Sequence, residues 1–246
     1  MLGWLLPVSL CAVRNPIIAA LDVPTAEAAL KLAEEIAPVV GAFKIGSELF
    51  TSAGPEIVRK IRATGASVFL DLKFHDIPNT VAKAIASATR LDVQMLTLHA
   101  CGGLEMMAAA RESALKTAAQ GGHEPPLVLA VTVLTSMNDS SLVETGCHST
   151  VAAQVERLAS LAVKAGMGGL VCSPLELPTL RKFVPDRMQL VTPGIRTGDE
   201  KADDQKRTLK PREAIAAGAN WLVVGRPIYA AADPRRAAEA ILQSLA

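Results

Sequence analysis

The feature that most constrains the fold is a repeated alternation between short apolar runs and longer segments with helical spacing. The runs are rich in β-branched residues and nearly continuous, which predicts parallel strands covered by helices on the outside. Such runs occur at residues 16–23, 42–46, 67–73, 93–99, 127–134, 169–173, 189–192 and 221–225. Eight strand–helix units in a chain of 246 residues predict an α/β fold, a single (β/α)8 TIM barrel.

The segments between these runs carry apolar residues three and four positions apart, as in amphipathic helices. Examples are Ala26, Leu30, Ala33 and Ile36, and then Val81, Ala84, Ile85 and Ala88. An open dinucleotide-binding sheet would need a glycine-rich turn after the first strand, where this chain has residues 22–25, Asp-Val-Pro-Thr. No linker separates two units, so we expect one domain over residues 1–246, with residues 1–14 as an apolar N-terminal arm.

Composition and charge exclude several classes of protein. The chain is 50% hydrophobic and 20% charged, unlike a disordered chain, and its formal net charge of +1 argues against nucleic acid or an anionic membrane as the main partner. No apolar run approaches the roughly 20 residues of a membrane span. The four cysteines form no close pair and no metal-ligand spacing with histidines. We therefore expect a cytoplasmic protein with reduced thiols.

Charged residues occur at the ends of the first three predicted strands, where a parallel barrel carries its chemistry. Asp22 closes the first run, Lys44 lies in the second, and Asp71 and Lys73 end the third. Because strand side chains alternate, Asp71 and Lys73 share the face of Phe69, which we expect to be the barrel interior. The sequence therefore predicts a row of alternating charges at the barrel mouth.

Such a row could be an ion-pair plug, but desolvation offsets much of the attraction between buried charges, so a functional site is favoured. A lysine between carboxylates keeps its proton, which suits a proton donor, or a cation facing a carbanion, better than a Schiff-base nucleophile. Metal chelation by Asp22, Asp71 and Asp76 stays open, although the interleaved lysines oppose a divalent cation.

The ends of the last two strands are typical of a phosphate site. Gly194 and Gly225 would allow close approach of the backbone to a ligand, and Arg226 offers a planar, multi-donor head. The polar stretch between Arg196 and Pro211 is longer than the usual connection of about 2–6 residues, which predicts a lid.

Residues 71–80, Asp-Leu-Lys-Phe-His-Asp-Ile-Pro-Asn-Thr, resemble the signature of the bacterial-type orotidine 5′-phosphate decarboxylase family. The shorter D-x-K-x-x-D core is shared with hexulose-phosphate synthases, whereas the Ile-Pro-Asn-Thr continuation singles out the decarboxylases. Further matches follow in family order at residues 22, 43–46, 99–103, 134–136, 192–196 and 224–227. The resemblance thus covers nearly the whole chain, departing at the N-terminal arm and at Cys101, where a smaller polar residue is expected.

The resemblance implies decarboxylation of orotidine 5′-phosphate to uridine 5′-phosphate and CO₂, the last step of pyrimidine synthesis, without metal or organic cofactor. It makes Lys73 the proton donor to C6, with Asp71 and Lys44 beside it and Asp22 on the ribose. It also makes Asp76 reach into the neighbouring subunit's site, which requires a homodimer.

The same resemblance assigns the remaining ligand contacts. Thr80 would join Asp76 in the neighbouring site, and Thr135 would meet the pyrimidine edge. Arg196 and Gln205 would close over the ligand. Gly225 and Arg226 would hold the phosphate. Two alternatives stay open: a metal-dependent hexulose-phosphate synthase-like aldolase or lyase on the same barrel, and a non-catalytic barrel that binds a phosphate ligand.

Overall fold

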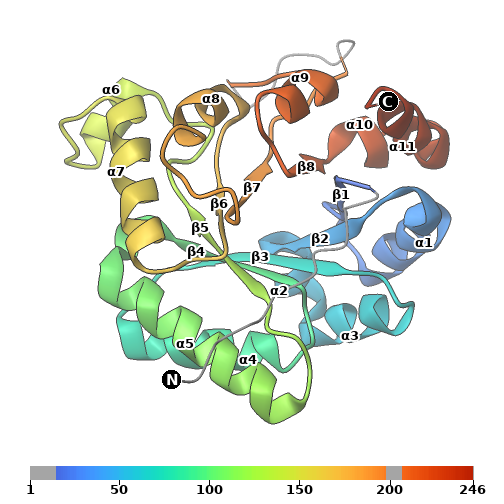
Figure 1. Cartoon of the computed structure of the whole chain (residues 1–246). Coiled ribbons are helices and arrows are strands. Elements are labelled where there is room, and N and C mark those ends of the chain that lie inside the picture. The colour runs from blue at the N-terminus through green and yellow to red at the C-terminus, as the bar shows by residue number, and fades with distance from the viewer. Residues whose placement is uncertain (1–14, 198–206, 246) are drawn as a thin grey trace.

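Eight parallel strands close into a barrel in chain order in the computed structural model, which describes residues 15–197 and 207–245. Helices surround this ring of strands (Figure 1), which confirms the predicted (β/α)8 barrel. The strands are β1 (Ile17–Ala20), β2 (Ala42–Gly46), β3 (Val68–Phe74), β4 (Met95–His99), β5 (Leu127–Val131), β6 (Gly169–Val171), β7 (Gln189–Thr192) and β8 (Trp221–Val224).

The helices of the described residues alternate with these strands, and several begin at identifiable caps. Thr25 accepts a hydrogen bond from the Ala28 amide at 3.2 Å, and Pro55 stands at the start of its helix, where a missing N–H costs little. The α-helices are α1 (Ala26–Ile36), α2 (Ser47–Ala53), α3 (Pro55–Ala63), α4 (Pro78–Thr89), α5 (Gly103–Gly121), α6 (Asp139–Glu144), α7 (Val151–Lys164), α8 (Leu177–Leu180), α9 (Pro211–Ala216), α10 (Arg226–Tyr229) and α11 (Pro234–Gln243). Short 3₁₀ turns occur at η1 (Ala37–Val39), η2 (Ala100–Gly102) and η3 (Pro174–Glu176).

Four of the eight strands, β1, β5, β6 and β8, end earlier than their apolar runs suggest. Strand β1 ends at Ala20, so Asp22 lies in the following connection, and β5 ends at Val131, well before Thr135. The helix stripes shift slightly as well: in α1 the buried residues include Leu32, while Leu30 is half-buried. Apolar character therefore continues into the connections at the barrel mouth, where the chain has already left the sheet.

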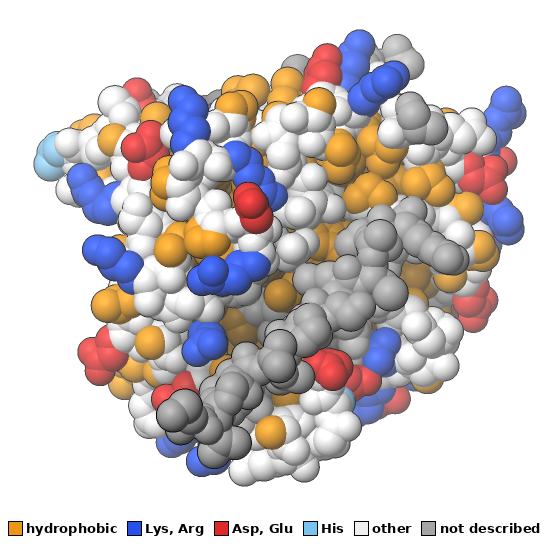
Figure 2. Space-filling model, viewed as in Figure 1, with side chains coloured by type: hydrophobic (Ala, Val, Ile, Leu, Met, Phe, Trp, Pro, Cys, Tyr) orange, Lys and Arg blue, Asp and Glu red, His pale blue; other side chains and the backbone are white. Residues whose placement is uncertain are grey.

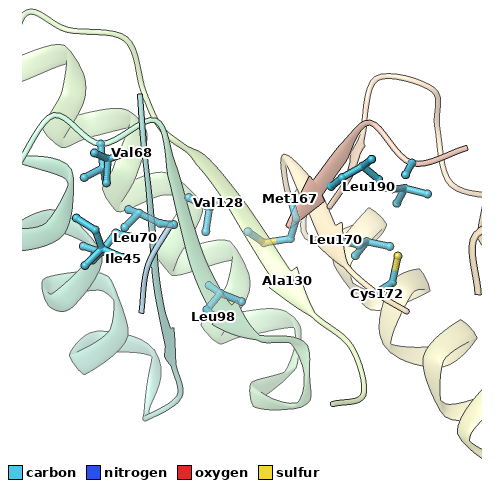
Figure 3. Packing of buried hydrophobic residues seen from close by; sticks show 14 of the residues in the cluster. Ile45, Val68, Leu70, Leu98, Val128, Ala130, Met167, Leu170, Cys172 and Leu190 are labelled. Carbon is cyan, nitrogen blue, oxygen red and sulfur yellow. The ribbon is translucent and has the colours of Figure 1, made fainter. Parts of the chain in front are cut away.

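The core has two layers separated by the sheet. The inner layer fills the barrel with the side chains of Ile18, Ala20, Ala42, Phe69, Met95, Leu129, Val191, Trp221 and Val223. The outer layer packs the strands against the helices, as Figure 3 shows for residues such as Ile45, Leu70 and Leu98. Phe69 inside and Leu70 outside match the predicted alternation, which directs Lys44 and Asp71 toward the mouth of the barrel.

Strand β3 departs from regular pairing where its charges occur. Leu70 pairs with Leu96 and Phe74 with Leu98, so β3 takes four residue steps where β4 takes two. Lys73, inside this irregularity, has a φ of 51°, a conformation uncommon for a residue other than glycine. Its amide donates to Thr97 Oγ1 at 2.9 Å. The bulge thus re-aims the chain immediately before the loop that leads to α4.

The surface carries charges of both signs, as the near-neutral net charge suggests, and the described cysteines are free. On the face shown in Figure 2, basic and acidic side chains are interspersed rather than gathered by sign. Cys101, Cys147 and Cys172 are free thiols. Within the described ranges, no helix is both long enough and apolar enough to cross a membrane. The predicted N-terminal arm, residues 1–14, lies outside the described residues.

Candidate active site

The structure brings four charged side chains into one row at the barrel mouth. Lys44 Nζ lies 2.9 Å from Asp22 Oδ1 and 3.9 Å from Asp71 Oδ2. Lys73 Nζ donates to both oxygens of Asp71 at 2.8 Å. The signs run minus, plus, minus, plus from β1 to β3, in the order that strand alternation predicts.

Burial divides this row into a covered middle and two accessible ends. The side chains of Lys44 and Asp71 are each 12% exposed, whereas those of Asp22 and Lys73 are 42% and 35% exposed. Buried charges need partners because desolvation is costly, and the two middle residues have them on both sides. The Lys73 ammonium is therefore held from below by Asp71 while it keeps one side open to the barrel mouth.

Thr97 completes the support of this row and was not anticipated from the sequence. It is fully buried in β4, donates from Oγ1 to Asp71 Oδ1 at 2.9 Å, and accepts the Lys73 amide at the same distance. One hydroxyl thus fixes both the carboxylate and the backbone that carries the ammonium. The available signal was a threonine on the inward phase of an apolar strand, between Leu96 and Leu98.

Gly46, at the end of β2, leaves the space that the row occupies. It lies opposite Asp71 in the sheet register. A Cβ atom at this position would stand 3.0 Å from Lys44 Nζ and 3.5 Å from Asp22 Oδ1. A side chain here would crowd the Lys44 ammonium, which would have to shift by a few tenths of an ångström, so glycine at this position leaves room for the row.

Asp76 and Thr80 lie beyond the row, on the exposed side of the β3–α4 connection. Asp76 Oδ1 accepts the Ile77 amide at 2.6 Å, and the Thr80 amide donates to the Ile77 carbonyl at 3.0 Å in the first turn of α4. Among residues 15–197 and 207–245, no ion pair links Asp76 to the charge row. Within one chain, both residues are exposed.

The candidate phosphate end is built from the connections after β7 and β8. Gly194 has a φ of 80° and its carbonyl accepts the Leu209 amide at 3.2 Å, while the Arg196 amide donates to the Leu209 carbonyl at 3.1 Å. These bonds form a stem at the base of the β7–α9 connection. Its outer part, with Gln205, falls outside the described residues.

The remaining predicted residues surround the same opening. A Cβ at Gly225 would lie 3.7 Å from Asp22 Oδ2, which places the β8–α10 turn beside the first carboxylate of the row. Arg226 is exposed at the start of α10. Thr135 is half-buried in the β5–α6 connection. Arg196 is half-buried, and its guanidinium donates to the Ile195 carbonyl at 3.0 Å.

Two histidines and a cysteine border the row without joining it. The rings of His75 and His99 lie 5.7 Å apart, and burial lowers the pKa of His99, helped by the charges of His75 and Lys73. Burial also raises the pKa of the Cys101 thiol, which argues against a thiolate nucleophile. In the described part of the chain, no cluster of three or more His, Cys, Asp or Glu side chains is arranged to hold a metal ion.

Comparison with known proteins places this barrel in a family. A family model described as "Orotidine 5'-phosphate decarboxylase / HUMPS family" matches residues 15–241. A protein named orotidine 5′-phosphate decarboxylase from Pseudomonas entomophila (strain L48) is 50% identical over 234 residues, covering 95% of this chain and 98% of the relative. One of the same name from Pseudomonas fluorescens (strain Pf0-1) is 51% identical over 235 residues, covering 96% and 99%.

The solved structures agree with the sequence relatives. The crystal structure of orotidine 5′-phosphate decarboxylase from Lactobacillus acidophilus is 37% identical, has a TM-score of 0.82, and covers 94% of this chain and 99% of its own. The fold, the order of the matched segments and these relatives all point the same way. The chain therefore belongs to the orotidine 5′-phosphate decarboxylase / HUMPS family.

Proposed function

We propose that this chain is a carboxy-lyase that converts orotidine 5′-phosphate to uridine 5′-phosphate and CO₂, with Lys73 as the proton donor. Family membership and the names of relatives matched along 98–99% of their length support the decarboxylase activity. The observation that carries the proton-donor role is the Lys73 ammonium, 2.8 Å from both oxygens of Asp71 and still open toward the barrel mouth.

The chemistry needs a fixed cation beside C6 of the pyrimidine. When the bond from C6 to the carboxylate breaks, CO₂ leaves and its bonding electrons stay on C6, where the ring delocalises them poorly. A preorganised ammonium stabilises that developing charge. Lys73 Nζ then transfers a proton to C6, which forms the C6–H bond of uridine 5′-phosphate. Asp71 holds the ammonium in place through both carboxylate oxygens, and Lys44 contacts Asp71 from its other side.

Binding away from the reacting carbon supplies the energy that orders the site. In this proposal, Asp22 binds the ribose, Thr135 the pyrimidine edge, and Gly225 and Arg226 the phosphate. Arg196 and Gln205 close over the ligand. The Gly225 turn lies beside Asp22, and Arg196 and Arg226 follow the paired strands β7 and β8, which supports this division into a reacting end and a phosphate end.

We further propose a homodimer with shared sites, in which Asp76 and Thr80 act in the neighbouring subunit. Both residues are exposed in their own chain. Ile77, between them in sequence, is 66% exposed, and Leu104, in the first turn of α5, is 45% exposed, which fits a covered interface. We also propose that the chain forms a single domain and acts in the cytoplasm.

Mixing two inactive variants tests the shared site. In the proposed dimer, each site uses Asp71 of one subunit and Asp76 of the other. A dimer of one Asp71→Asn subunit and one Asp76→Asn subunit therefore has one site with both aspartates and one site with neither. Activity of the mixture, absent from either variant alone, is the expected result. A mixture as inactive as its parts would contradict the shared site while leaving the decarboxylase assignment in place.

The activity itself is tested by following the loss of orotidine 5′-phosphate absorbance with and without a chelator. We expect turnover that the chelator leaves unchanged, with CO₂ and uridine 5′-phosphate as products. The hexulose-phosphate synthase-like alternative is less well supported, because Lys44 and Lys73 occupy the space beside the carboxylates that a divalent cation would need. Chelator-sensitive aldol chemistry on a phosphosugar, without decarboxylation, would favour that alternative.

A further inference from the structure

Arg207 lies where three connections of the barrel mouth meet. It follows the undescribed part of the β7–α9 connection, and its Nη1 pairs with Glu176 Oε1 from the β6–α8 connection. Its Nη2 donates to the carbonyl of Leu134 at 3.1 Å, in the β5–α6 connection. The acceptor is the carbonyl of the peptide bond that leads into Thr135. One guanidinium thus joins a fixed carboxylate to the backbone next to a proposed pyrimidine contact.

Glu176 is a rigid anchor for this guanidinium. Its side chain is 9% exposed, and its second oxygen accepts the amide of the fully buried Ser173 at 2.9 Å. Burial raises the pKa of Glu176, and the charge of Arg207 opposes that rise. The Arg207 side chain is itself only 16% exposed. Because a bidentate donor is held from one side by a buried carboxylate, its other arm has little freedom.

The stem of the β7–α9 connection does not depend on this contact. The backbone bonds between Gly194, Arg196 and Leu209 close it independently. On another side, Arg207 borders a cavity of about 430 Å³ lined also by Met137, Asn138 and Val151. Hydrogen bonds, more than packing, therefore set the guanidinium position, and the segment they restrain is the one that carries Leu134 and Thr135.

We propose that Arg207 is a positioning residue that, anchored on Glu176, holds the Leu134–Thr135 peptide against the pyrimidine end of the ligand. This inference rests on the proposed function, because it needs Thr135 to meet the base. In this proposal the base end of the ligand depends on the peptide that Arg207 holds, and the phosphate end depends on the separate stem of the β7–α9 connection. Loss of the Leu134 contact weakens recognition of the base, while the phosphate end, closed by its own stem, keeps its affinity.

Three variants separate positioning from simple loss of stability. Arg207→Met alone leaves the Glu176 carboxylate buried without its cation, which destabilises the fold. The double variant Arg207→Met with Glu176→Gln removes the unpaired charge as well. It keeps the hydrogen bond to the Ser173 amide, because a glutamine oxygen can still accept it. Arg207→Lys keeps a cation for Glu176 but lacks the planar fork that also reaches Leu134. Unfolding in urea identifies which variants retain wild-type stability.

The probes are uridine 5′-phosphate, which carries the base, and ribose 5-phosphate, which lacks it, both titrated by calorimetry. In the double variant and in Arg207→Lys we expect uridine 5′-phosphate to bind about tenfold more weakly, as for one lost charged hydrogen bond, and ribose 5-phosphate to change less than about twofold. Turnover of orotidine 5′-phosphate should show a matching loss of kcat/KM.

Equal weakening of both probes, or of neither, in folded variants would overturn the inference. The titrations measure binding without turnover, so their result does not depend on whether the protein catalyses the decarboxylation. A wild-type protein that binds uridine 5′-phosphate but does not convert orotidine 5′-phosphate would contradict the proposed function. Its variants would still report whether Arg207 serves the base end.

Discussion

Lys73 combines two features that seldom occur in one residue. Its ammonium is held by both oxygens of Asp71, and its backbone lies in the left-handed region with φ at 51°. That conformation costs on the order of 1–2 kcal/mol for a residue with a Cβ. The hydrogen bond from its amide to Thr97 helps to hold it. Backbone geometry and charge placement are therefore fixed by the same two neighbours.

Lys73→Ala tests the ammonium directly. Because the variant lacks the proposed proton donor, we expect turnover to fall by about a thousandfold or more, as when a donor to developing charge is removed. The phosphate end is untouched, so uridine 5′-phosphate should still bind. Near-normal turnover in a variant that binds this nucleotide would contradict the proposed role.

Thr97→Val tests the buried hydroxyl at nearly constant shape. Asp71 loses one donor and the Lys73 amide loses its acceptor, so we expect kcat to fall by about tenfold to a hundredfold. Unfolding in urea should show a loss of about 1–3 kcal/mol.

A matched control is Thr89→Val in α4. Thr89 is equally buried, yet its hydroxyl has no hydrogen-bond partner among the described residues. Removing that hydroxyl should leave stability and kcat close to wild type. Equal effects from the two substitutions would contradict a special role for Thr97.

His99 gives the fold a predictable response to acid. Burial lowers its pKa, with further contributions from His75 and Lys73 and an opposing one from Asp71. The unfolded chain then binds a proton at higher pH than the folded chain, so stability falls as pH drops below about 6.5. His99→Gln should flatten this part of the stability profile measured by urea unfolding between about pH 5 and 7.5. An unchanged slope would contradict it.

At the scale of elements, the sequence predicts the barrel better than the site. Continuous apolar runs reveal which segments are strands, and alternation assigns the faces of Phe69 and Leu70 correctly, because both signals depend on local burial. Strand ends are less predictable, since the apolar character of the β5 run continues beyond Val131. The charge row follows from strand order, because adjacent strands in a barrel place their ends side by side.

What the sequence does not reveal are partners that depend on register. Thr97 becomes important only because the β3 irregularity brings Asp71 and the Lys73 amide to its hydroxyl. Arg207 and Glu176 lie far apart along the chain and meet across two connections. The inward phase of Thr97 can be read from the sequence, but neither set of contacts has a local signature in composition or spacing.

The turn after β8 can be tested as an element through Arg226→Ala. Arg226 stands exposed at the start of α10, so we expect little effect on folding. KM for orotidine 5′-phosphate should rise by about tenfold to a hundredfold, as expected for a lost charge-assisted pair with a phosphate. Orotidine, which lacks the phosphate, is the control substrate. An equal loss with orotidine would show that Arg226 does not act through the phosphate.

On the scale of the whole molecule, one end of the barrel carries the charge row and the other end carries hydrogen bonds that stabilise the fold. At the end opposite the charge row, the Arg181 guanidinium donates to the carbonyls of Gly218 and Met188 and to the Asn220 side chain. These acceptors immediately precede β7 and β8. Burial lowers the pKa of Arg181. This cluster links the entry points of two strands and lies away from the ligand.

Arg181→Met should therefore separate stability from activity. The apolar stem is kept while several partly buried acceptors lose their donor, so we expect a loss of about 2–4 kcal/mol in urea unfolding. At temperatures where the variant is folded, kcat and KM should match the wild type. A fall in kcat without loss of stability would contradict this division of the barrel.

The irregularity in β3 has a consequence for how such a chain can change over time. Between Leu70 and Phe74, β3 carries two residues more than the facing stretch of β4, and an even number keeps Phe74 on the same face as Leu70. Part of the stretch from Asp71 to Lys73 is therefore additional to what pairing with β4 needs, while Asp71 itself still pairs with Gly46 of β2. Substitutions there can alter the reaction while the barrel around them stays intact, so one scaffold can host different chemistries at the same place.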